Sequence, residues 1–206
     1  MDVEKLKQKI LDLAIRGKLV PQDPNDEPAS VLIEKIRAGK EALIKQGKIK
    51  RDKNESYIFK GDDNSYYEKV GEKTVCIDNE IPFSIPSSWC WQRLCSVCFI
   101  NPSVNTDDAS EVSFVTMKDI QAGFVNSFSS SKTLWKSVKT NFTHFQNEDI
   151  GLAKITPCFE NRKSVIFKGL INGIGAGTTE LNIIRVDQRI LLNEYLLYLL
   201  NNCIPS

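Results

Sequence analysis

Three cysteines near the middle of the chain have a spacing that could bind an iron–sulfur cluster. Cys90, Cys95 and Cys98 follow the pattern C-x4-C-x2-C, which matches part of the plant-type cluster run. They alternate with tryptophan, leucine and valine, however, and this mixture is more typical of thiols packed in a hydrophobic core. We therefore expect no metal ligands here, and an enzyme that uses these thiols is kept as an alternative.

The chain offers little material for nucleophilic or nucleotide-dependent catalysis. His144 is the only histidine, and a catalytic triad needs a base that contacts both a nucleophile and an orienting group. We expect His144 to be an ordinary loop residue. Residues 173–177 read G-x-G-x-G but lead into a strand pattern, so we expect a tight turn there and not a phosphate cradle. We expect no catalytic residues, and the sequence favours a binding module.

The hydrophobic pattern predicts an α+β protein with an N-terminal helical hairpin, followed by a mixed α/β domain with a twisted β-sheet. Apolar residues three and four apart predict an amphipathic helix over residues 3–16, and Gly17 follows it as a C-cap. A second helix is expected to begin near 26–28 and to end at Gly47. Apolar and β-branched runs predict strands near 112–117, 150–155, 164–167 and 181–186, and an apolar helix over 188–202.

These elements divide the chain into three parts. Residues 1–53 are expected to form a helical spacer region and residues 54–80 an irregular connector or hairpin. Residues 81–206 are expected to form the compact α/β domain.

The composition is that of a globular protein without a strong electrostatic preference. The 206 residues include 27 Lys and Arg against 26 Asp and Glu, for a net charge of +1. Six cysteines without a secretory signal indicate reduced thiols, and no apolar stretch reaches the roughly 18 residues of a membrane span. We expect a cytoplasmic protein that makes no contact with a membrane.

Several segments together resemble the specificity subunits of type I restriction–modification systems. Residues 6–30, beginning LKQKILDLAIRGKLVPQ, look like the conserved helical region of that family. The run Ile85-Pro86-Ser87-Ser88-Trp89 is similar to the start of its target recognition domain, and residues 153–161 and 173–181 resemble its later signature. The matches extend over nearly the whole chain, and in combination they are specific.

This resemblance implies a non-catalytic subunit that reads DNA sequence. In the family, two target recognition domains are held apart by long helices and each reads half of a split duplex site. The helices dock methyltransferase subunits, and nuclease/translocase subunits join that assembly. S-adenosylmethionine, ATP and magnesium would then belong to those partners, and this chain would need no cofactor of its own.

The number of domains departs from the family pattern. This chain has one recognition-like domain, a short helical region before it and almost nothing after it. We expect either a fragment or a half-length subunit that forms a homodimer through the helical region. Two copies related by a two-fold axis would predict an inverted-repeat target.

Basic and polar residues in the C-terminal half supply the candidate DNA contacts. Three lysines without acidic neighbours in the sequence lie in one polar segment, residues 132–139, which we expect to be a loop. A second group of basic residues lies on either side of a polar loop near residue 160. We predict that loops, not strands, bind DNA, with most lysines on phosphates and Asn161 and Arg162 on base edges. The candidate residues are Lys132, Lys136, Lys139, Lys154, Asn161, Arg162, Lys163, Lys168, and the family-signature residues Thr178 and Thr179.

Two other classes of protein remain as alternatives. The first is a protein–protein adaptor whose first 50 residues drive assembly and whose α/β domain binds no nucleic acid. The second is an enzyme, either a nuclease with a scattered active site or the cysteine-dependent enzyme considered above. The lysines would also be explained by an ordinary solvent-exposed charged surface that binds no DNA.

Overall fold

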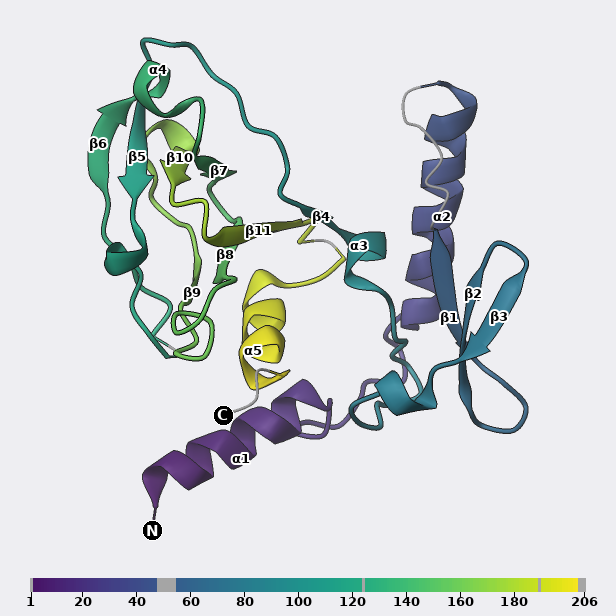
Figure 1. The fold of residues 1–206 in the computed structure, drawn as a ribbon. Helices are drawn as coiled ribbons and strands as arrows, with labels where there is room; N and C mark the ends of the chain where they lie inside the picture. Colours follow the sequence, from purple (N-terminus) through teal and green to yellow (C-terminus); the bar gives the residue numbers. More distant parts are fainter. Residues whose placement is uncertain (1, 48–54, 124, 189, 204–206) are drawn as a thin grey trace. The chain divides into compact units, whose positions relative to one another are not determined.

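The computed structural model describes residues 2–47, 55–123, 125–188 and 190–203. The chain forms two compact units, Met1–Ser96 and Val97–Ser206, called the first and second unit below. Both units mix helices with sheets (Figure 1), which confirms the predicted α+β class but also places a sheet in the first unit.

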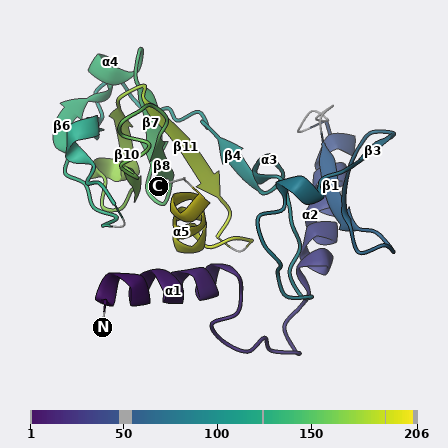
Figure 2. The same ribbon diagram turned by 60° about the horizontal axis from the view of Figure 1, so that its bottom comes forward.

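The first unit begins with the two predicted helices. Helix α1 spans Val3–Ile15, and Asp2 caps it by accepting a hydrogen bond from the Lys5 N–H. Helix α2 spans Ala29–Lys45, and Gly17 and Gly47 follow the two helices with positive φ, as expected of C-terminal glycines. A helical hairpin is not seen, because α1 and α2 do not run side by side in Figure 1 or in Figure 2.

The segment between the helices makes contacts with a later part of the first unit. Instead of turning back, this proline-containing stretch packs on the Ser84–Trp89 run. Trp89 Nε1 donates a hydrogen bond to Gln22 Oε1 at 3.0 Å, and the Ala29 N–H donates to the Ser88 carbonyl at 2.8 Å. Gly17 is required here, since a Cβ would lie 2.8 Å from Pro86 Cγ and 2.9 Å from a Trp89 ring carbon.

The segment predicted to be an irregular connector or hairpin contains a three-stranded antiparallel sheet. Its strands are β1 (Ser56–Lys60), β2 (Tyr66–Val70) and β3 (Lys73–Cys76), in the order β1-β2-β3. A short 3-10 helix, η1 (Asp78–Glu80), follows. The aromatic and apolar residues of β1 and β2 favour strands, whereas all four residues of β3 are exposed.

The first unit also extends past the expected boundary at residue 81. Arg93 donates to Glu68 of β2, with Nε at 2.9 Å from Oε1, and to Glu80 at 2.6 Å. These ion pairs tie the 81–96 segment to the small sheet, and the compact units therefore divide between Ser96 and Val97. Residues 48–53 of the predicted helical region lie outside the described residues.

Acid should weaken the first unit through Glu68. Hydrogen bonds from Arg93, and then from Ser56, lower the pKa of Glu68 from 4.5 to about 2. Because the folded pKa is depressed, this stabilisation is present above about pH 4.5 and is lost as the pH falls toward 2. We expect the free energy of unfolding to decline over that interval in urea titrations. Glu68→Gln should flatten the decline, whereas exposed Glu72→Gln should keep it; an unaltered profile in Glu68→Gln would refute this role.

The second unit contains two four-stranded sheets with strand orders β6-β5-β10-β7 and β4-β11-β8-β9. Strand β10 runs parallel to β5, and the other strand pairs described in these two sheets are antiparallel. The strands of the first sheet are β5 (Glu111–Val115), β6 (Ser131–Leu134), β7 (Thr143–Gln146) and β10 (Ile174–Gly177). Those of the second are β4 (Cys98–Ile100), β8 (Ile150–Ala153), β9 (Ser164–Ile166) and β11 (Leu181–Val186).

The helices of the second unit are short except for the last. Helix α3 (Leu94–Val97) leads into the unit, α4 (Trp135–Val138) follows β6, and η2 (Met117–Asp119) and η3 (Ile171–Gly173) are 3-10 turns. Helix α5 (Asn193–Cys203) starts later than predicted and packs along β9. Buried Ser164 and Asn201 join α5 to β9 by a hydrogen bond of 3.0 Å.

The core of the second unit joins side chains from both sheets. Phe145 of β7 and Phe167 stack with ring centroids 3.8 Å apart, and both are fully buried. A second cluster surrounds Trp135 and includes Val112, Val138 and Ala176. Burial of this aromatic surface fixes the scaffold from which the polar loops project.

Candidate nucleic-acid interface

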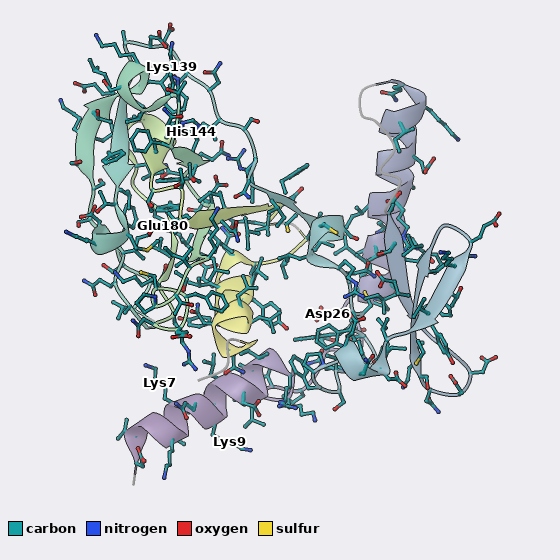
Figure 3. All side chains as sticks on the ribbon, in the orientation of Figure 1. Lys7, Lys9, Asp26, Lys139, His144 and Glu180 are labelled. Atoms are coloured by element: carbon teal, nitrogen blue, oxygen red, sulfur yellow. The ribbon has the colours of Figure 1, made fainter. Side chains whose placement is uncertain are left out.

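Three of the candidate lysines lie on or beside β6 and α4, at one end of the second unit. Lys132 is in β6 and Lys136 is in α4. Lys139 follows α4 and is labelled in Figure 3. The prediction that they share a loop is therefore wrong. A strand and a helical turn form because Trp135 and Val138 are buried beneath this segment.

Two of these lysines are also paired with acids, contrary to the sequence analysis. Lys132 Nζ lies 2.7 Å from Glu111 Oε1, and Lys139 Nζ lies 2.7 Å from Asp108 Oδ2. The acids are remote in sequence but become neighbours because β5 and β6 pair antiparallel. Lys136 is exposed and makes no ion pair among the described residues.

A second set of candidates meets at the opposite end of the strands. Residues 154–163 form a loop between β8 and β9, called loop 154–163. The Lys154 N–H donates to the Glu180 carbonyl at 2.9 Å, which brings the Thr178–Glu180 turn beside this loop. The structure therefore groups Lys154, Asn161, Arg162, Lys163, Thr178 and Thr179, and separates them from Lys132, Lys136 and Lys139. In Figure 3, the labelled Glu180 and Lys139 lie in these two separate regions.

Within this group the side chains differ in what they can still contact. Lys154 and Asn161 are exposed, and their side chains make no hydrogen bond among the described residues. Lys163 is partly buried, and its ammonium donates to the Met117 carbonyl at 2.8 Å. Thr178 Oγ1 accepts a hydrogen bond from the Glu180 N–H at 3.2 Å, whereas Thr179 is exposed. Arg162 adopts positive φ, at 53°.

Lys168 lies apart from both sets, beside α5. Its ammonium is 3.0 Å from Glu194 Oε1 and 3.7 Å from Glu148 Oε2. The hydrogen bond to Glu194 and the charge of Glu148 raise the pKa of Lys168. The expectation of a lysine without acidic neighbours is wrong here as well.

A loop that the sequence analysis missed lies against loop 154–163. Residues 116–123 and 125–129 belong to this loop, called loop 116–129, which begins at η2. Asp119 accepts hydrogen bonds from the Thr116 N–H and hydroxyl, both at 2.7 Å, and these hydrogen bonds lower the pKa of Asp119. The Thr-x-x-Asp spacing of a capping box was the signal in the sequence that could have revealed this turn.

The glycine-rich segment is a strand and not a turn. Gly175 and Gly177 belong to β10, where a Cβ would lie 2.2 Å from a Phe145 ring carbon and 2.2 Å from the Val115 carbonyl oxygen, respectively. Gly173 alone, of these three glycines, has positive φ. The glycines therefore allow close packing of neighbouring strands, which explains them without a phosphate ligand.

The residues considered for metal or acid–base chemistry are not brought together. Among the described residues, no three His, Cys, Asp or Glu side chains are placed to hold a metal ion. Cys95 is exposed and Cys98 is buried, on either side of the division between the two units. His144 lies in β7 and not in a loop, with Nε2 2.8 Å from the Val138 carbonyl oxygen and its ring against Trp135.

Comparisons with known proteins show which curated sequences this chain is similar to. No protein-family model matches the chain. The specificity subunits of the type I restriction enzymes EcoAI and EcoEI, both from Escherichia coli, are each 46% identical to it over 196 residues, or 95% of this chain. The chain spans 30% of the length of each of these two relatives.

The comparison with solved structures gives a weaker likeness. A chain of a solved type I R-M system, described for its complex assembly and conformational transition, has a TM-score of 0.47 and 20% identity. The similarity covers 58% of this chain and 31% of that one. The sequence similarity agrees with the resemblance: over 95% of its length, this chain is similar to part of the specificity subunits of two type I restriction enzymes.

The helices give no indication of a membrane span. In the part of the chain that the structure describes, every helix is too short or too polar to cross a bilayer.

Proposed function

We propose that the chain is a sequence-specific DNA recognition subunit of a type I restriction–modification enzyme, and that the second unit reads part of a bipartite duplex site. The observation that carries this proposal is the 46% identity, over 95% of the chain, to two specificity subunits. The grouping of polar and basic side chains on loop 154–163 and the Thr178–Glu180 turn is in keeping with it.

The proposed subunit is non-catalytic and directs other subunits to their target. Methylation and cleavage would be carried out by methyltransferase and nuclease/translocase partners, which would hold S-adenosylmethionine, ATP and magnesium. Helices α1 and α2 are the segments that we assign to partner docking. Val3, Leu6 and Ile10 of α1 are exposed, so this helix presents apolar side chains to solvent.

A homodimer through the helical region remains part of the proposal. Two copies related by a two-fold axis would present two second units to an inverted repeat with a fixed spacer. The molar mass of the purified chain in solution, measured by light scattering, tests this assembly directly. A monomer at concentrations that support DNA binding would rule the homodimer out.

Selection from a randomised duplex pool tests the recognition function. The complete chain is used alone and in complex with a modification subunit, and bound duplexes are sequenced after successive rounds. We expect enrichment of a defined motif, and an inverted repeat if the chain acts as a homodimer. Recovery of the starting distribution in both arms would contradict a role in sequence recognition and would favour a protein–protein adaptor.

Removal of the Lys136 ammonium should weaken DNA binding without regard to sequence. Lys136 is exposed and free of acidic partners among the described residues, so its charge is available to a phosphate. A phosphate contact releases counterions, and Lys136→Ala should therefore reduce the slope of log affinity against log salt by about 0.9. Lys35→Ala, which removes a lysine already paired with Glu27, is the matched control and should leave the slope unchanged. An unchanged slope in Lys136→Ala would remove Lys136 from the interface.

A further inference from the structure

Loop 116–129 and loop 154–163 are held together as one surface at the lower end of the second unit in Figure 1. The Gly123 N–H donates to the Asn161 carbonyl at 3.0 Å, and the Lys163 ammonium donates to the Met117 carbonyl at 2.8 Å. A third bond joins the first loop to the following strand, from the Ile166 N–H to Asn126 Oδ1 at 2.8 Å. We call these paired loops the two-loop surface.

In both loops of the two-loop surface, hydrogen bonds and buried side chains hold the backbone in place. Ile120 is fully buried in the core and forms an isolated bridge with Phe128, and the next residue, Gln121, bonds through its N–H to the Ser127 carbonyl at 3.0 Å. On the other loop, the Asn161 N–H donates to the Pro157 carbonyl at 2.9 Å. A side chain on such a backbone is positioned before a ligand arrives, which reduces the entropy lost on binding.

Two amide side chains project from this fixed backbone. Gln121 lies in sequence between Met117 and Gly123, the two points at which its loop is tied to the other, and Asn161 is at one of those ties. Both residues are exposed, and neither amide bonds to another described residue. Asn and Gln amides can form paired hydrogen bonds with N6 and N7 of adenine in the major groove.

We propose that Gln121 and Asn161 read adenine on the target duplex, and that Lys163 is a positioning residue that holds their two loops in register. The proposal rests on the DNA-recognition function given above. It assigns a base-reading role to Gln121, which lies outside the lysine-rich stretches of the sequence. It also gives Lys163 a role different from a phosphate contact, because its ammonium is partly buried and bound to Met117.

The test compares variants of the complete chain on the motif selected from the randomised duplex pool. Gln121→Ala and Asn161→Ala should each lose preference for adenine at one or two adjoining positions. The ratio of affinities for the matched and the substituted duplex should fall by about 5- to 150-fold. Gln188→Ala removes an exposed amide that contacts Glu148 elsewhere in the unit, and it should leave the ratio unchanged.

The role of Lys163 is separated from that of a phosphate contact by the salt dependence. Lys163→Met should relax preference at the same positions as the amide variants, with an unchanged salt slope. Lys154→Ala, the control for a phosphate contact, should weaken matched and scrambled duplexes alike and lower the slope by about 0.9. Lys163→Met behaving like Lys154→Ala would overturn the positioning role.

The outcomes distinguish this inference from the proposed function. A selected motif that Gln121→Ala and Asn161→Ala both retain would overturn the amide assignment and leave the recognition function intact. The absence of any motif in the unaltered chain, alone and in complex, would overturn both. The two amide variants alter exposed side chains, so a loss of adenine preference with unchanged thermal unfolding would support the inference directly.

Discussion

Gly177→Ala should destabilise the second unit by about 3 kcal/mol, near the upper end of the usual cost of overpacking a core. The added Cβ would lie 2.2 Å from the Val115 carbonyl oxygen in the neighbouring strand β5. That oxygen belongs to the backbone and cannot rotate away, so β5 and β10 would have to separate. The expected lowering of the melting temperature is on the order of 10 °C.

Thermal unfolding by circular dichroism measures this effect, and hydrogen exchange assigns it to Val97–Ser206. Gly39→Ala is the matched control, because a Cβ there meets no atom within 4 Å and Gly39 lies within helix α2. Alanine should stabilise that helix by about 0.5–1 kcal/mol. If Gly177→Ala and Gly39→Ala were both destabilised, or if neither were, the result would contradict the close approach of β10 and β5.

Arg185→Met should cost about 3–5 kcal/mol, because it leaves a buried carboxylate without its partner. Asp149 is fully buried, and Arg185 donates to both of its carboxylate oxygens at 2.7 Å. Among the described residues, the Gln146 N–H, at 2.8 Å from Oδ2, would then be the donor left to the Asp149 carboxylate. Arg185→Lys keeps the charge but not the two-pronged geometry, and should fall between the wild type and Arg185→Met.

Urea unfolding provides the measurement, with an exposed ion pair as the control. Lys132→Met breaks the pair with Glu111, in which both side chains are about half exposed, at 60% and 49%. Solvent screens such a pair, so we expect a loss below about 1 kcal/mol. If Arg185→Met also lost less than about 1 kcal/mol of unfolding free energy, removal of Arg185 would not leave an unpaired charge buried at Asp149.

Elements with a strong hydrophobic period could be predicted from the sequence. Helix α1 follows its apolar spacing closely, and strands β5, β8, β9 and β11 coincide with runs of Val, Ile and Leu. Strand β10 was not predictable in this way because two of its four residues are glycine. Glycine is needed at these positions because a Cβ would collide with the Phe145 ring or the Val115 carbonyl oxygen. These groups become neighbours only when strands distant in sequence pair, so the local sequence does not show the need.

The candidate interface was predictable only in part, for the same physical reason. Sequence proximity suggested that Lys132, Lys139 and Lys168 lacked acidic partners, but strand pairing and the packing of α5 supply Glu111, Asp108 and Glu194. Loop 154–163 was recognised by its polar composition. Its partner, loop 116–129, has mixed composition, and its place beside Asn161 depends on backbone hydrogen bonds that no local pattern encodes.

The most direct test of the central claim is the ratio of two affinities, measured at one physiological salt concentration. The complex of the chain with a modification subunit is titrated with the selected duplex and with a duplex of the same composition in scrambled order. Sequence-specific recognition predicts at least a roughly 10³-fold preference for the selected duplex. Equal affinity for the two duplexes would contradict the account, because an electrostatic attraction to phosphates would then explain all of the binding.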